Sequence, residues 1–152
     1  MKNEIKNKIF SHSASGGIQM KAISAKATAG LNLGAKVIAS DNSGAKIVRI
    51  VSVKRSRAKK GKQVCAKIAD WVKVSVRKGI PDMKGKVFDA IVIRQKKPYQ
   101  RLTGERIAFE DNAVAILKDE KGNPKGTQIK GPVAKEVMER WPQVAKISSL
   151  VY

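Results

Sequence analysis

Apolar and polar residues alternate with a period of two over much of the chain, which is the pattern of half-buried β-strands. The segment 70–77 shows it most clearly, because Val72, Val74 and Val76 share one side while Trp71 and the polar residues between the valines share the other. Residues 90–93 instead form a continuous apolar run, typical of a strand that is covered on both faces. Both segments are therefore expected to be strands, and the second is expected to be the more deeply buried.

Shorter segments carry the same pattern between turns. Residues 35–39 lead through the Asx- and glycine-containing turn 40–44 into residues 45–53, which predicts a hairpin or tight meander. Residues 106–109 and 113–117 complete the set. About five to seven short strands at close spacing predict a mainly β fold with a small closed barrel.

Near its end the chain changes period. Val133, Val137 and Trp141 follow the spacing of an amphipathic helix, and Pro132 suits the first turn of that helix. Pro142 is expected to end it and to begin a second short helix that runs to residue 150. A pair of short α-helices within residues 132–150, capping one end of the barrel, is therefore predicted.

The first nineteen residues differ from the rest and are interpreted as a flexible N-terminal extension. They include the polar run Ser11–Gly17, and they lack the apolar segment of a secretory signal. Gly16 and Gly17, at the end of this run, would be encoded by purine-rich codons, and a bacterial-type ribosome-binding sequence is also rich in purines. Because such a sequence lies just upstream of a start codon, Met20 is a candidate for the true start of the protein. Residues 20–152 are expected to form one domain with the helical segment at its end.

Charge narrows the class of partner. The chain has 32 Lys and Arg against 12 Asp and Glu, a formal net charge of +20. Such an excess repels itself unless a polyanion neutralises it, so nucleic acid is the first candidate and an anionic membrane surface the second. The cations are spread along the chain, no apolar run is long enough to span a membrane, and the C-terminal segment has a polar face of mixed charge. Nucleic acid is therefore favoured, and no membrane partner is expected.

Three basic loops carry most of the functional signal: residues 54–62, 78–86 and 94–101. One such loop alone is usually a solvated surface, but three loops and a basic strand face together indicate binding to phosphates. Of the few aromatic residues, only Trp71, Tyr99 and Tyr152 are expected to be free to stack on bases. This favours recognition of folded RNA by its backbone and shape.

Other chemistry is poorly represented. Cys65 and His12 are each the only residue of their type, which excludes a disulfide framework and a zinc finger. The glycines of residues 79–86 do not match the spacing of a phosphate-binding loop of nucleotide-binding proteins, and Glu110-Asp111 is interpreted as part of a turn that pairs with Arg106. No cofactor, metal or enzymatic activity is expected; the alternatives are a free single-strand-binding barrel and an RNA-modifying enzyme.

Five separate blocks carry a recognisable pattern in a fixed order: Ser40–Lys46, Ala90–Tyr99, Phe109–Ala113, Lys125–Lys135 and Glu139–Pro142. Together they resemble large-subunit ribosomal protein fourteen of the archaeal and eukaryotic branch. The resemblance runs from about Met20 to the end of the chain. It implies a small five-stranded closed β-barrel with a C-terminal helical region, located in the cytoplasm on the large ribosomal subunit.

The resemblance also implies a function and partners. The protein would be a structural constituent that binds and organises large-subunit rRNA near the subunit interface and contributes to an intersubunit bridge with small-subunit rRNA. Its protein neighbours would be large-subunit protein three and protein twenty-four of the archaeal and eukaryotic type. The anti-association initiation factor would dock on its C-terminal region.

The residues expected at these interfaces come partly from the basic loops and partly from the resemblance. The loops and the basic strand face contribute Lys54, Arg55, Arg57, Lys59, Lys60, Lys73, Arg77, Lys84 and Lys86 to the RNA contacts. The resemblance adds Lys46, Arg49, Arg94, Lys96, Lys97 and Arg101. It assigns the protein-facing role to Lys135, Glu139, Trp141, Val144 and Ile147. Replacing Arg94, Lys96 and Lys97 together by alanine is expected to leave the fold intact and to weaken assembly.

Two stretches depart from the family pattern. The family usually has a Val-Gly-Asp-like turn where this chain has Ile68-Ala69-Asp70, so the local backbone is expected to differ there. Residues 54–66 vary within the family, which makes individual RNA contacts in that loop hard to assign.

Overall fold

The computed structural model describes residues 21–54, 56, 58 and 61–152. The predicted extension of residues 1–19 and the start at Met20 lie outside the described residues, so the proposed division into an extension and one domain stays a prediction.

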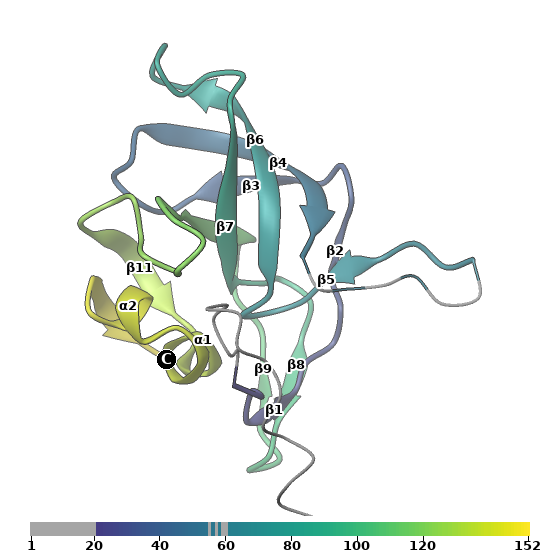
Figure 1. Cartoon of the computed structure of the whole chain (residues 1–152). Coiled ribbons are helices and arrows are strands. Elements are labelled where there is room, and N and C mark those ends of the chain that lie inside the picture. The colour runs from purple at the N-terminus through teal and green to yellow at the C-terminus, as the bar shows by residue number, and fades with distance from the viewer. Residues whose placement is uncertain (1–20, 55, 57, 59–60) are drawn as a thin grey trace, which may run out of the picture.

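Five strands close into a barrel, in the order β10-β3-β4-β6-β7. Neighbouring strands are antiparallel except β10 and β3, which are parallel. The predicted small five-stranded barrel is therefore confirmed, as is the hairpin of the first two barrel strands in the sequence (Figure 1). The barrel strands are β3 (Lys36–Ala39), β4 (Ala45–Val53), β6 (Trp71–Gly79), β7 (Val87–Arg94) and β10 (Ala113–Ile116).

The barrel core follows the period-two pattern. Val72, Val74 and Val76 of β6 all point inward and are buried, while Lys73 and Arg77 between them are exposed. Residues 90–93 of β7 are fully buried, as the continuous apolar run predicted. The apolar alternation thus encodes both the strands and the face that each strand turns to the core.

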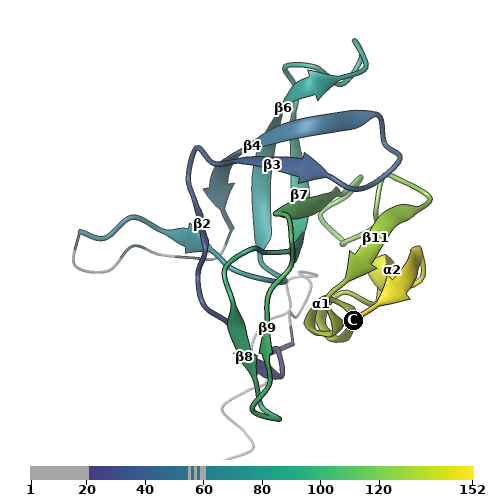
Figure 2. The same ribbon diagram turned by 180° about the vertical axis from the view of Figure 1, so that it is seen from behind.

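Short strands extend the barrel at its sides. Strands β1 (Ala25–Lys26), β8 (Tyr99–Arg101) and β9 (Arg106–Ile107) form a three-stranded sheet, and β2 (Leu31–Asn32) pairs with β5 (Cys65–Ala66). The β8–β9 hairpin leads away from the barrel at the bottom of both views (Figures 1 and 2). The hairpin loop between β6 and β7 protrudes at the opposite end.

The C-terminal segment forms a unit of two strands and two short helices. It comprises β11 (Ile129–Val133), α1 (Lys135–Arg140), α2 (Pro142–Ala145) and β12 (Ser148–Val151). The helix pair is confirmed, but Pro132 lies in β11 and Leu150 lies in β12, so the predicted helical span of residues 132–150 is too long at both ends. Strand β12 pairs in parallel with β11, and this long-range pairing overrides the helix-like spacing of its apolar residues.

Trp71 and Trp141 hold the C-terminal unit against the barrel. Their rings meet edge to face with centroids 5.8 Å apart, and the indole N–H of Trp141 donates to the backbone oxygen of Ala69 at 2.9 Å. Trp71 was expected on the outer face of β6 but is only 5% exposed. It is buried because it lies at the start of the strand, where the C-terminal unit covers that side.

Ala69 has a left-handed backbone, with φ of 63°. Among the described residues it is the one non-glycine residue with positive φ. Its side chain is fully buried, and its N–H donates to the backbone oxygen of Val92 at 2.9 Å. The chain therefore keeps at alanine a conformation that favours glycine, at a cost of about 1 to 2 kcal/mol.

Replacing Ala69 by glycine should change the free energy of unfolding by less than about 1 kcal/mol. Relief of the left-handed strain offsets the lost methyl burial and the greater entropy of the unfolded chain. Ala66→Gly is the matched control, because Ala66 is also fully buried but has no positive φ. It should destabilise the protein by about 1 kcal/mol more than Ala69→Gly in urea titrations. Equal losses in the two variants would show that Ala69 carries no strain.

Candidate nucleic-acid interface

The predicted RNA-contacting cations fall into three groups. Eight of them are exposed on the surface: Lys46, Arg49, Lys73, Arg77, Lys84, Lys86, Lys96 and Lys97. Three are engaged inside the protein: Lys54, Arg94 and Arg101. Arg55, Arg57, Lys59 and Lys60 lie outside the described residues, so their assignment stays a prediction.

The outer face of β3, β4 and β6 gathers cations from three adjacent strands. Lys36 of β3 is the register partner of Arg49 of β4, and Arg49 is the partner of Ser75 of β6. Arg77 follows on the same face of β6, and together with Gly34 these three cations line a surface hollow of about 520 Å³. Lys36 was missed in the sequence, although the alternation of β3 places it outward. The hollow depends on strand neighbours that periodicity alone does not reveal.

The loop between β6 and β7 presents cations at one end of the molecule. Lys84 and Lys86 are exposed there, on either side of Gly85, whose φ of 81° completes the turn. The N–H of Gly85 and that of Val76 pair with backbone oxygens across the base of the hairpin. A well-formed turn therefore carries the two exposed lysines, in the loop that protrudes from the barrel between β6 and β7 (Figure 1).

Lys96 and Lys97 form a third exposed basic group just after β7. The backbone N–H of Lys96 donates to the side-chain oxygen of Asn112 at 2.8 Å, and the ammonium of Lys97 donates to the backbone oxygen of Ala29 at 3.0 Å. The first contact fixes the backbone at Lys96, and the second ties the side chain of Lys97 to the segment before β2. The predicted loop is therefore positioned by its neighbours, with the charge of Lys96 directed to solvent.

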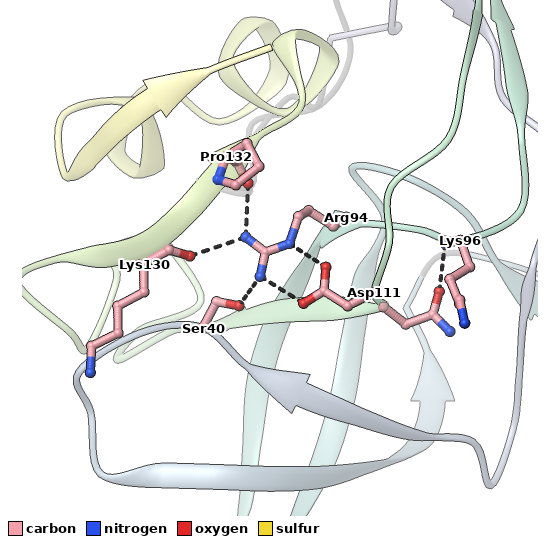
Figure 3. A network of polar contacts seen from close by, with 7 residues as sticks. Ser40, Arg94, Lys96, Asp111, Lys130 and Pro132 are labelled. Carbon is pink, nitrogen blue, oxygen red and sulfur yellow. Dashed lines mark hydrogen bonds and ion pairs between the residues drawn. The ribbon is translucent and has the colours of Figure 1, made fainter.

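Arg94 takes part in contacts within the protein. It is only 6% exposed, and its guanidinium lies at the centre of a polar network (Figure 3). Its N–H groups donate to both oxygens of Asp111, at 2.6 and 2.9 Å, and to the hydroxyl of Ser40. They also donate to the backbone oxygens of Lys130 and Pro132, at 3.0 and 2.8 Å. The guanidinium of Arg94 is thus occupied by acceptors within the protein, and its assignment to RNA stays a prediction. Asp111 pairs with Arg94 instead of with Arg106.

Lys54 is also engaged within the protein. Its ammonium lies 3.0 Å from Asp89 and 2.9 Å from Glu120, and 3.9 Å from the ring centre of Trp71. Burial acts to lower the pKa of Lys54, but hydrogen bonds with Glu120 and Asp89 outweigh it and raise that pKa. The ammonium of Lys54 therefore already has two carboxylate partners within the protein, and its predicted RNA contact stays a prediction.

Arg101 joins the β8–β9 hairpin to the C-terminal unit. Its guanidinium pairs with Glu136 of α1 at 2.7 Å and donates to the backbone oxygen of Tyr152 at 2.7 Å. The hydroxyl of Tyr99 donates to the other carboxylate oxygen of Glu136, also at 2.7 Å. Burial and the bond to Glu136 raise the pKa of Tyr99. Tyr99 is therefore structural and is not free to stack on bases. Arg101 joins two parts of the protein, and its assignment to RNA stays a prediction.

Few aromatic rings remain for stacking on bases. Trp71 and Tyr99 are buried, which corrects the expectation that they are free. Tyr152 is exposed, as expected, and its ring meets Phe109 edge to face. The surface is therefore better suited to phosphates than to splayed bases.

The protein-facing residues are likewise divided. Lys135 and Glu139 are exposed on α1, and Ile147 is half-buried. Trp141 and Val144 are buried in the C-terminal unit, so they support that surface from below and do not form it. A nearby hollow of about 650 Å³ includes Leu150 and Tyr152 in its lining, which sequence analysis missed because Leu150 was assigned to a helix.

The part of the chain that the structure describes has no membrane-spanning helix and no metal-binding cluster. Neither of its helices is long and apolar enough to cross a membrane. No cluster of three or more His, Cys, Asp or Glu side chains with the arrangement of a metal site occurs there.

Comparisons with known proteins give one consistent result. Residues 30–152 match the family model described as ribosomal protein L14p/L23e. A relative from Nanoarchaeum equitans, named large ribosomal subunit protein uL14, is 54% identical over 87% of this chain and 99% of its own length. Proteins of the same name from Methanothrix thermoacetophila and Thermoplasma acidophilum are 46% and 45% identical over the same shares.

Replacing Arg94 by alanine should destabilise the fold by about 3 to 5 kcal/mol, because it leaves Asp111 and two backbone oxygens without their buried donor. Arg94→Lys should be intermediate, since a lysine cannot reproduce the planar fork. Urea titration followed by circular dichroism measures both.

The control is the double variant Lys96→Ala/Lys97→Ala, which should lie within about 0.5 kcal/mol of the original protein because both side chains are exposed. The expectation that replacing Arg94, Lys96 and Lys97 together by alanine leaves the fold intact is therefore revised, because Arg94→Ala alone should destabilise it. A stable Arg94→Ala variant would contradict the structural role of Arg94.

Stability should fall as the pH rises above about 10, because the unfolded chain loses the Tyr99 proton there while the folded state retains it. The folded pKa of Tyr99 is raised, so its contribution is fully present below the unfolded pKa and is lost as pH climbs toward the folded one. Tyr99→Phe should flatten this alkaline decline in thermal melts between about pH 9 and 12. Tyr152→Phe, at an exposed ring, should follow the original protein. Identical alkaline slopes for all three proteins would exclude the role of Tyr99.

Proposed function

Because the chain belongs to the ribosomal protein L14p/L23e family, we propose that it binds and organises large-subunit rRNA near the subunit interface and contributes to an intersubunit bridge. Members of this family are structural, non-enzymatic components of the large ribosomal subunit. The observation that carries the proposal is the 54% identity to a large-subunit protein over 99% of that protein's length.

The distribution of charge supports an architectural role. Lys and Arg side chains that displace condensed counterions bind RNA without reading its sequence. The eight exposed cations lie on the barrel face, on the β6–β7 loop and after β7, so they are directed to more than one side of a closed barrel. A stiff barrel with positive charge on several sides could lie between packed RNA helices and fix the spacing between them.

The C-terminal unit is our candidate for protein contacts. Lys135, Glu139 and Ile147 present side chains at its surface, beside the hollow that contains Leu150 and Tyr152. Large-subunit protein three, protein twenty-four of the archaeal and eukaryotic type, and the anti-association initiation factor are the proposed partners. Small-subunit RNA is the proposed partner across the interface.

The first test is sucrose-gradient fractionation of a lysate at low and high magnesium, with the protein followed by mass spectrometry. It should track the large subunit under both conditions, because its contacts are proposed to be with that subunit. The same spectra report whether the native protein begins at Met1 or at Met20. Protein that stays at the top of both gradients would overturn the ribosomal role and favour a free nucleic-acid-binding module.

A variant tests the assigned cations in the same gradients. Lys96→Ala/Lys97→Ala should lower occupancy of the large subunit, and large subunits carrying it should need more magnesium to associate with small subunits. Lys118→Ala/Lys121→Ala is the control, because it removes the same charge from two exposed lysines outside the proposed contacts. Equal occupancy of the two variants would contradict the assignment of Lys96 and Lys97.

A further inference from the structure

Lys36 and Arg49 place like charges opposite each other on neighbouring strands. They are register partners in the antiparallel pair β3–β4, and both side chains are exposed on the outer face. Like charges directly opposite each other destabilise a sheet. Arg77 adds a third cation from β6, so the arrangement weakens the isolated barrel unless an anion lies between the side chains.

The described part of the protein supplies no such anion. Its ion pairs use Lys54, Arg94, Arg101 and Arg140, and none uses Lys36, Arg49 or Arg77. The hollow that these three cations line contains no Asp or Glu. Cations directed inward are thus matched with carboxylates, while these three converge without one.

The backbone leaves room at this place. Gly34 has φ of 85°, and a Cβ there would come within 3.3 Å of an Arg49 guanidinium nitrogen. An adjoining hollow of about 490 Å³ shares Gly34, Arg49 and Arg77 and includes the exposed side chains of Val51 and Val87. The guanidinium therefore lies against the turn, with an apolar surface beside the cations.

We propose that Lys36, Arg49 and Arg77 form a binding site for phosphodiester groups of an RNA backbone. Guanidinium groups match phosphate oxygens in two-point hydrogen bonds, and the lysine adds a compact charge. Val51 and Val87 offer apolar contact to the adjoining sugar. The site reads no base, and it rests on the proposed function because the phosphates belong to rRNA.

Lys36→Glu tests the site through two effects of opposite sign. In the free protein it converts a like-charge pair into a cross-strand ion pair with Arg49, so the Tm should rise by about 1 to 3 °C. With in-vitro transcribed large-subunit rRNA of Nanoarchaeum equitans in 0.1 M salt, affinity should fall by about tenfold or more, because a phosphate-binding cation is reversed. If Lys36 had only a structural role, its substitution would not raise the Tm of the free protein while lowering its affinity for rRNA.

Lys130→Glu is the matched control. Lys130 is also an exposed strand lysine, in β11, and its side chain points away from the Arg94 network (Figure 3). The substitution makes the same change in net charge outside the barrel face, and screening should limit the loss of affinity to less than about threefold. Equal losses for Lys36→Glu and Lys130→Glu would overturn the site while leaving the proposed function intact.

Salt dependence gives a second, independent readout. Lys36→Gln, Arg49→Gln and Arg77→Gln should each reduce the slope of log affinity against log salt by about 0.7 to 0.9, as expected for one lost phosphate contact. Unchanged slopes in all three variants would overturn the site. If the original protein itself does not bind the rRNA, the proposed function fails and this inference fails with it.

Discussion

The buried guanidinium of Arg94 is the contact on which the arrangement of the barrel and the C-terminal unit depends. It lies at the end of β7, next to the fully buried residues 90–93, and its donors reach Asp111, Ser40 and two backbone oxygens of β11. A charge removed from water is tolerated only where its hydrogen bonds are satisfied, and here each guanidinium nitrogen has at least one acceptor. Because the acceptors come from separate parts of the chain, one residue fixes how those parts meet.

This arrangement divides the excess positive charge into two populations. Lys54, Arg94 and Arg101 face inward and are paired with Asp89, Asp111 and Glu136 respectively. The exposed cations of the barrel face and of the loops have no such partners within the described residues. The excess positive charge of the described residues is therefore carried largely on surfaces that a polyanion can reach. The inward pairs hold the scaffold, and the scaffold determines where the outward charges lie.

The strands could be predicted because their signal is local. The period of two in β6 and the apolar run in β7 each occupy one short segment, and burial follows from them directly. The errors concern residues whose partners are remote in sequence: Arg94 is 17 residues from Asp111, and Tyr99 is 37 from Glu136. The sequence around a basic residue beside a buried strand does not show whether the fold brings a carboxylate next to it. The C-terminal strand β12 was misassigned for the same reason, since its pairing with β11 is a long-range contact.

Ala69 shows how this scaffold maintains a costly conformation. Its backbone is left-handed, with φ of 63°, although its side chain carries a Cβ. Its N–H is bound to β7, and its carbonyl accepts the Trp141 indole N–H, so the barrel and the C-terminal unit both hold this residue. Strained backbone survives where the surroundings over-determine it. The same contacts fix Trp141 against Trp71 and thereby set the position of α1, which carries Glu136 to Arg101. The strained backbone of Ala69 is thus held in place at the junction between the barrel and the C-terminal unit, which carries the surface proposed for protein contacts.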